Sequence, residues 1–153
     1  AGYRCSCRGG SGRMTGELIF YAARKTSLCE RSLRKSFSEL DLIADEAKFA
    51  ANCKTLGELV VSSLKTNDIV FVTGGLDIGG ESDSPSVFAR AFADNPPLEM
   101  KRLKNSSGRD GYVFASDSQA IILLPDDPQQ IENIMNGALR GFLKRYRENK
   151  LIA

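Results

Sequence analysis

An apolar run near the middle of the sequence ends in a glycine-rich, acidic loop. Residues 69–72 (Ile-Val-Phe-Val) predict a strand buried on both faces, because a surface strand would alternate polar with apolar residues. Glycines let a bound group approach the main chain, and the loop begins with Thr73, Gly74, Gly75 and Leu76. Asp83 or Ser84 can cap a helix whose first turn holds Pro85, which would point main-chain N–H groups toward the loop. The segment predicts a site for an anionic or phosphate-bearing ligand, unless it is an ordinary strand–turn–helix connection.

Carboxylates follow two other apolar runs, at Asp45-Glu46 and at Pro125-Asp126-Asp127-Pro128. The carboxyl ends of the strands in an open α/β sheet face one edge, so these two loops and loop 73–83 are expected to converge there. Clustered carboxylates, hydroxyls and glycine amides suit a magnesium ion that bridges a phosphate, because Mg²⁺ prefers hard oxygen ligands. The alternative is that three of these acids only cap helices: Asp45, Asp83 and Asp127.

These loops must be positioned by the elements between them. Residues 17–93 alternate between short apolar runs and helical stripes. Strands are predicted at 17–22, 40–44 and 69–72, and helices at 26–37, 47–64 and 85–93. The β-α-β-α-β-α order predicts an α/β fold with a mainly parallel sheet.

The rest of the chain predicts a hairpin and a final helix. Residues 98–110 are polar and basic, which indicates either an exposed loop beside a binding cleft or a solvated crossing over the surface. Residues 112–115 and 120–124 flank a polar turn and predict one antiparallel pairing. Asp127 is the expected N-cap of the last helix, and Pro128 fits its first turn.

Length and composition fit one globular domain. With 153 residues, 42% of them hydrophobic, the chain should bury roughly 68 to 70% of the surface that its unfolded form exposes. Residues 1–13 have the composition of a flexible leader. The domain is therefore expected at 14–153.

Residue content excludes several classes of function. The chain has no histidine, which excludes His-dependent triads and dyads, and its four cysteines lack the paired spacing of a zinc site. Reduced thiols are typical of a cytoplasmic protein. No apolar run reaches the ~20 residues of a membrane span, so no membrane is expected. The pI of 8.4 falls short of the strongly basic profile of nucleic-acid-binding domains, and no recognisable reader motif appears. A nucleic-acid partner is therefore not expected.

The same loops resemble the molybdopterin-binding domain family, which includes molybdopterin adenylyltransferases and the N-terminal domain of competence/damage-inducible protein A. The resemblance spans residues 17–145. Asp45-Glu46 resembles the family's P-D-D/E step, and residues 68–76 (DIVFVTGGL) resemble its D-hydrophobic-T-G-G-T/L signature. Residues 83–86 resemble its D-x-T element, 105–111 its glycine-containing approach to the hairpin, and 121–128 (IILLPDDP) its I-x-L-P-G-x-P segment.

The resemblance implies a three-layer αβα fold, often trimeric, that binds molybdopterin or a related pterin with its phosphate near the T-G-G loop. It assigns catalysis and Mg²⁺ binding to Asp45 and Asp83. The ligand-binding residues that it implies are Thr73, Gly74, Gly75, Leu76, Ser84, Ser107, Gly108, Pro125 and Asp126. It also implies a homo-oligomer with a small phosphate-bearing ligand.

The chain departs from the family pattern where the family has glycines. Residues 22–25 (Ala-Ala-Arg-Lys) follow the first strand, and Asp77 and Asp126 replace two further glycines. These acids should repel a phosphate unless a metal intervenes, whereas Arg24 and Lys25 can contact one directly.

Three functions therefore stay open. The first is Mg-dependent chemistry, either nucleotidyl transfer in molybdenum cofactor biosynthesis or nucleotide pyrophosphate cleavage, as in competence/damage-inducible protein A. The second is ligand binding without catalysis. The third is a structural role through an oligomer interface.

Overall fold

The computed structural model describes residues 14–76, 87–88, 99–105, 108–116 and 119–152. Within these residues a seven-stranded sheet lies at the centre, in the order β2-β1-β4-β7-β6-β5, and β3 also pairs with β1. The strands are β1 (Met14–Tyr21), β2 (Leu42–Ala44), β3 (Lys48–Ala50), β4 (Ile69–Thr73), β5 (Glu99–Leu103), β6 (Gly111–Ala115) and β7 (Ala120–Leu124). The helices are α2 (Thr26–Leu40), α3 (Cys53–Leu64), α5 (Pro128–Asn136) and α6 (Ala138–Ile152).

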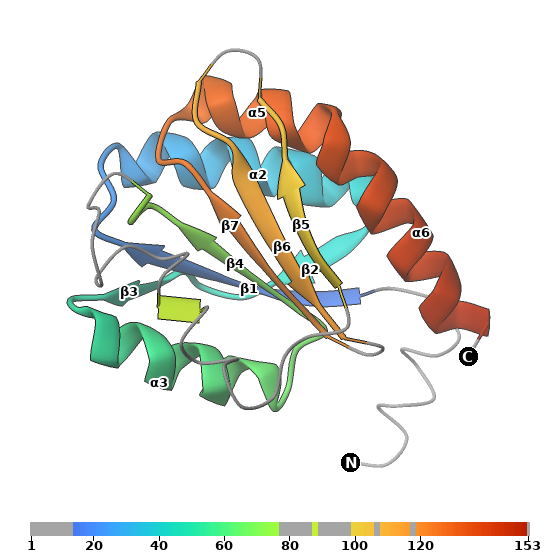
Figure 1. The fold of residues 1–153 in the computed structure, drawn as a ribbon, viewed down its shortest axis with the longest axis horizontal. Coiled ribbons are helices and arrows are strands. Elements are labelled where there is room, and N and C mark those ends of the chain that lie inside the picture. The colour runs from blue at the N-terminus through green and yellow to red at the C-terminus, as the bar shows by residue number, and fades with distance from the viewer. Residues whose placement is uncertain (1–13, 77–86, 89–98, 106–107, 117–118, 153) are drawn as a thin grey trace.

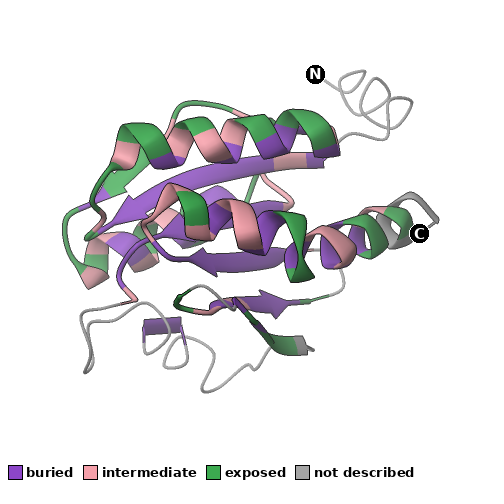
Figure 2. Cartoon of the chain, turned by 90° about the horizontal axis from the view of Figure 1, so that it is seen from above, coloured by how far each residue is buried: buried purple, intermediate pink, exposed green. Residues whose placement is uncertain are grey.

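Helices cover both faces of the sheet (Figure 1). Helices α2, α5 and α6 lie on one face and α3 lies on the other. Seen from above, α2, α5 and α6 turn exposed residues outward and buried residues toward the strands (Figure 2). The predicted three-layer αβα architecture is confirmed.

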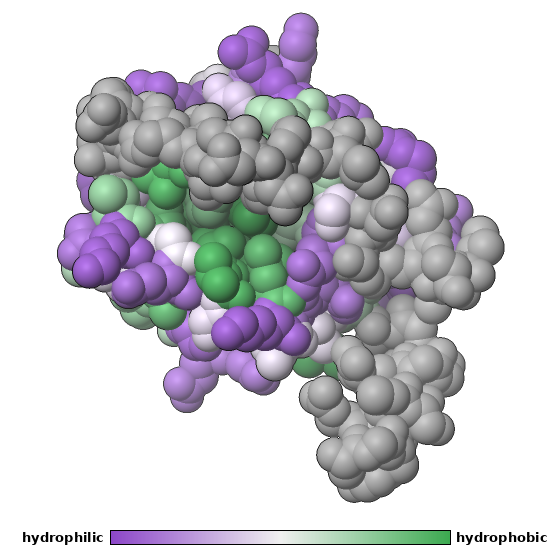
Figure 3. Space-filling model, turned by 60° about the horizontal axis from the view of Figure 1, so that its bottom comes forward, coloured by the Kyte–Doolittle hydropathy of each residue, from purple (hydrophilic) through white to green (hydrophobic). Residues whose placement is uncertain are grey.

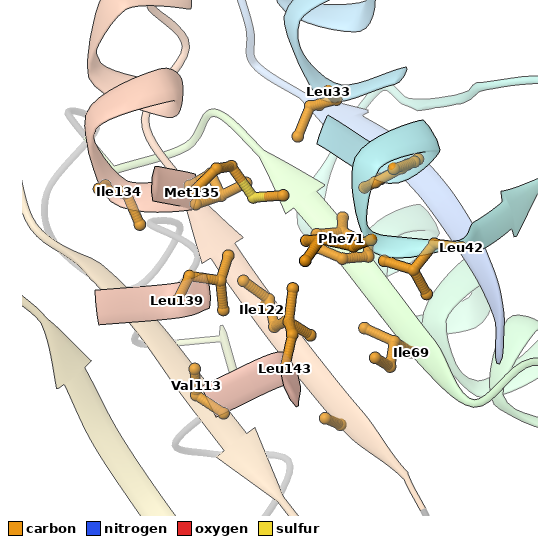
Figure 4. Packing of buried hydrophobic residues seen from close by; sticks show 14 of the residues in the cluster. Leu33, Leu42, Ile69, Phe71, Val113, Ile122, Ile134, Met135, Leu139 and Leu143 are labelled. Carbon is orange, nitrogen blue, oxygen red and sulfur yellow. The ribbon is translucent and has the colours of Figure 1, made fainter. Parts of the chain in front are cut away.

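Each face of the sheet carries its own core. Under α2, α5 and α6, four fully buried side chains pack together: Leu33, Phe71, Ile122 and Leu139 (Figure 4). Under α3 the core includes Val70 and Val72. Strand β4 thus contributes alternate residues to both cores, which explains why its sequence is continuously apolar.

The sheet is mainly parallel, as predicted. Strands β1, β4 and β7 run parallel to one another. The predicted antiparallel hairpin of β6 and β7 is confirmed. Strand β6 is also antiparallel to β5, so the described strands form one antiparallel pairing more than expected. The additional strand, β5, lies within the segment predicted as a loop. Its exposed Lys101 and Arg102 hide the strand pattern, and such charges are common on sheet edges.

The second predicted strand ends at Ala44 as expected, but an unpredicted strand, β3, follows it. Strand β2 pairs with Met14–Gly16 of β1, and β3 continues the same edge by pairing with Ile19–Tyr21. The predicted helix 47–64 therefore begins only at Cys53, where Asn52 caps it by accepting the Thr55 N–H at 2.9 Å. Phe49 has helical spacing to Cys53, so the sequence pattern assigns this strand residue to the helix.

The final helix begins as predicted, with Asp127 as N-cap and Pro128 in its first turn. It then breaks at Gly137 into α5 and α6. None of the described helices combines the length and apolar character that crossing a membrane requires. The predicted leader 1–13, and all of predicted helix 85–93 except Val87 and Phe88, lie outside the described residues.

Candidate functional site

The carboxyl ends of three neighbouring strands form the candidate site. Thr73 at the end of β4 is directly opposite Phe20 of β1 on one side and Leu124 of β7 on the other. The segments that leave these strands, 22–25, 74–76 and 125–127, therefore start side by side at one edge of the sheet. This is the edge at which open α/β sheets bind ligands.

Thr73 carries an unsatisfied hydroxyl. Residues directly opposite each other share a face of the sheet, so the Thr73 side chain faces α2 and α5 together with Phe20 and Leu124. It is 1% exposed, and among the described residues nothing forms a hydrogen bond with its Oγ1. Burying a hydroxyl without a hydrogen bond costs about 1–3 kcal/mol of folding free energy. A bound ligand or a water that forms a hydrogen bond with Oγ1 would remove this cost.

Gly74 and Gly75 make the turn that follows. Both have positive φ, 100° and 75°, a region that side-chain-bearing residues rarely adopt. The Gly74 N–H donates to the Leu124 carbonyl oxygen at 2.9 Å, and a β-carbon at Gly74 would overlap the Tyr21 carbonyl oxygen. The close approach that glycine permits is here an approach of two main-chain segments of the protein itself.

Two ion pairs join the N-termini of α2 and α5 beside this turn. Asp126 Oδ2 accepts the main-chain N–H of Arg24 at 2.8 Å and its Nε at 3.3 Å. Lys25 Nζ lies 3.5 Å from Asp127 Oδ2. The sequence suggests Arg24 and Lys25 as direct phosphate contacts. In the structure Arg24 pairs with Asp126, which replaces a glycine of the family pattern, and Lys25 pairs with the neighbouring Asp127.

Asp127 also caps α5. Its Oδ1 accepts the N–H groups of Gln129 and Gln130 at 3.0 and 3.2 Å. The hydrogen bond from Gln130 is the main cause that lowers the pKa of Asp127 below its usual value, and the bonds from Gln129 and Lys25 act in the same direction. The carboxylate is therefore ionised at neutral pH.

The first turn of α2 holds a buried thiol. Cys29 is 0% exposed. Burial raises its pKa to about 11, and the negative charges of Asp126 and Asp127 add to the effect. The thiol stays protonated at neutral pH and is not poised as a nucleophile.

The loop between β5 and β6 reaches the same edge. Gln130 of α5 accepts the Arg109 N–H at 3.0 Å, and a β-carbon at Gly108 would overlap the Gln130 side chain. Arg109 Nη1 also lies 3.5 Å from the Leu76 carbonyl oxygen. Arg109 was absent from the sequence-based candidates, although it lies in the 105–111 segment that carries the resemblance.

The structure does not bring Asp45 to this edge. Asp45 and Glu46 lie between β2 and β3, opposite the middle of β1, because Gly16 pairs with Ala44 and Ile19 with Lys48. At about 3.3 Å per residue, Asp45 is on the order of 10 Å short of the strand ends. The expected convergence of Asp45 with the other two loops was wrong, and Asn52 takes the corresponding place after β3.

The predicted site residues are therefore only partly assembled. Thr73, Gly74, Gly75, Leu76, Gly108, Pro125 and Asp126 lie at the strand-end edge. Asp83, Ser84 and Ser107 lie outside the described residues. Within the described part of the chain, no group of three or more Cys, Asp or Glu residues is placed to hold a metal ion.

An apolar hollow of about 640 Å³ lies on the α3 face (Figure 3). It is lined mainly by α3 residues, with Val87, Phe88 and Ile121. None of the predicted site residues lines it, so it is separate from the candidate site.

Comparison with known proteins shows the fold. No protein-family model and no curated protein matches the sequence. Among solved structures, molybdenum cofactor biosynthesis protein B superposes with a TM-score of 0.67 at 10% identity, covering 91% of this chain and 96% of that one. MogA gives 0.61 at 14% identity, covering 86% and 99%. CinA from Thermoplasma acidophilum, a protein of unknown function, gives 0.59 at 13% identity, covering 88% and 99%. The resemblance drawn from the sequence is confirmed at the level of the fold.

Proposed function

We propose that this protein binds molybdopterin or a related phosphate-bearing ligand at the turn formed by Thr73, Gly74 and Gly75. The observation that carries the proposal is the buried Thr73 hydroxyl, which has no hydrogen-bond partner among the described residues. Similar folds occur in a molybdenum cofactor biosynthesis protein and in MogA, which supports this class of ligand.

The chemistry of the surrounding groups supports an anionic ligand. The N-terminus of α2 has no side-chain cap and no acid in its first turn, so its main-chain N–H groups favour negative charge. Arg24 and Arg109 extend from the neighbouring loops. A phosphate beside Thr73 would accept a hydrogen bond from the hydroxyl and lie among these cationic groups.

Mg-dependent catalysis is a separate proposal that requires more than ligand binding. The described residues do not fit a Mg²⁺ site, because Asp45 is remote and the carboxylates of Asp126 and Asp127 already have cationic and amide partners. Nucleotidyl transfer or pyrophosphate cleavage would therefore depend on Asp83, which lies outside the described residues. Assembly into a trimer and location in the cytoplasm stay predictions from the sequence.

One experiment separates these proposals. The purified protein is mixed with molybdopterin and Mg-ATP without oxygen and then desalted, and retained pterin and adenylylated pterin are both measured. Retained pterin that disappears in Thr73→Val supports the binding function. Adenylylated product that disappears in Asp83→Asn adds catalysis. Absence of both pterin and product contradicts the proposed function.

A further inference from the structure

The Asp126 carboxylate lies where an anion would be bound. It accepts two hydrogen bonds from Arg24, one from the main-chain N–H at 2.8 Å and one from the guanidinium at 3.3 Å. Its side chain is 13% exposed, whereas that of Arg24 is 77% exposed. The acid is therefore largely enclosed, and its partner extends into solvent.

Its donors are of the kind that phosphate sites use. Arg24 directly precedes Lys25, the N-cap of α2, and that helix end has no side-chain cap of its own. A helix N-terminus and an arginine together make an anion site. Asp126 reaches this helix end from α5's entry segment, so the carboxylate is an internal occupant.

A second observation points to a ligand at the same place. Thr73 ends β4, the strand between β1 and β7, so it lies between the two strands whose loops carry Arg24 and Asp126. Its buried Oγ1 has no partner within the described part of the chain. The internal carboxylate satisfies Arg24 but leaves the Thr73 hydroxyl unsatisfied.

We propose that Asp126 is an internal competitor that sets the specificity of the site. A phosphate of the ligand replaces the Asp126 carboxylate on Arg24 and also reaches the Thr73 hydroxyl. Because a phosphate monoester carries a charge near −2 at neutral pH and a carboxylate carries −1, the site selects phosphate- or pyrophosphate-bearing ligands over carboxylates. This inference rests on the phosphate site of the proposed function.

The test uses inorganic pyrophosphate as the probe and calorimetric titration at low ionic strength, where charge effects are least screened. Asp126→Asn keeps the size of the side chain and removes its charge. It should bind pyrophosphate about tenfold more tightly than the wild type, since a nearby repulsive charge is removed. The affinity of this variant for acetate should rise by a smaller factor.

Asp41→Asn is the matched control. Asp41 also pairs with an arginine, Arg147, at 3.1 Å, but at the opposite end of α2, about 22 Å away along a 15-residue helix. Asparagine tolerates the left-handed conformation of Asp41. This control changes the net charge equally and should leave pyrophosphate affinity within about twofold.

An unchanged affinity in a folded Asp126→Asn protein would overturn the inference. If that variant does not fold by circular dichroism, Arg24→Gln decides. A roughly tenfold loss of pyrophosphate affinity supports the inference, and unchanged affinity overturns it.

Molybdopterin retention is measured on the same proteins, so that the two proposals fail separately. A gain for pyrophosphate without retained pterin supports the internal competitor and contradicts the molybdopterin function. Retained pterin without a gain in pyrophosphate affinity supports the molybdopterin function and contradicts the internal competitor.

Discussion

The Gly74 N–H donates to the carbonyl oxygen of Leu124 at 2.9 Å, which ties the turn after β4 to the end of β7. The bond forms while Gly74 has a φ of 100° and lies against the Tyr21 carbonyl group of β1. The turn is thus fixed from both neighbouring strands. A ligand at Thr73 would meet a preformed main chain and would not have to order it.

Gly74→Ala should destabilise the protein. The alanine would have to adopt a disfavoured φ, and its methyl group would overlap the Tyr21 carbonyl oxygen. We therefore expect the free energy of unfolding to fall by about 2 kcal/mol or more. Gly57→Ala in α3 is the control, because its added β-carbon would meet no atom of the described residues within 4 Å beyond its chain neighbours and the backbone of its own helix. That change should raise stability by about 0.5–1 kcal/mol. Equal urea midpoints for the two variants would contradict the described turn.

Thr73→Val should not destabilise the ligand-free protein. The substitution removes a buried hydroxyl without a described partner, so the free energy of unfolding should stay constant or rise by about 1 kcal/mol. Urea unfolding of the two proteins, without ligand, gives the comparison. A loss above about 1 kcal/mol would mean that the hydroxyl already has a partner in the fold.

Asp127→Ala should cost stability in a pH-dependent way. Loss of the α5 cap should lower the free energy of unfolding by about 1 kcal/mol at pH 7. Because folding lowers the pKa of Asp127 below 3.8, its stabilisation is present above that pH and is lost as the pH falls below it. Thermal unfolding between pH 2 and 7 should show the two proteins converging in acid. Asp45→Ala is the control, because the exposed Asp45 carboxylate caps no described helix. It should change the free energy of unfolding by no more than about 0.5 kcal/mol. A constant difference across the range would count against the role of Asp127.

Cys29 should resist alkylation. In a chain with Cys5→Ser and Cys7→Ser, iodoacetamide at pH 8 should modify the half-buried Cys53 and spare Cys29 until urea unfolds the protein. Since folding raises the pKa of Cys29 from 9.0 to about 11, its contribution to stability is present below pH 9 and declines above it. Peptide mass spectrometry identifies the modified residue. Equal modification rates for Cys29 and Cys53 in the native protein would contradict its burial.

The sequence was sufficient for the parts of the fold that depend on local pattern. Strand β4 and its turn were predictable because a continuous apolar run meets two glycines, and Asp127 was predictable as a cap from the Pro128 beside it. Asp45 was misplaced because β3 is only three residues long and Phe49 has helical spacing to the next segment. The Arg24–Asp126 pair joins residues 102 positions apart, and no local pattern specifies such a contact.

A ligand site at Thr73 is tested by measuring the affinity for molybdopterin, by pterin fluorescence without oxygen, in the wild type, Thr73→Val and Thr73→Ser. The valine variant, as stable as the wild type, should bind at least about tenfold more weakly, and the serine variant, which keeps the hydroxyl, should retain most of the affinity. Equal affinity for the wild type and the valine variant would contradict a ligand site at Thr73.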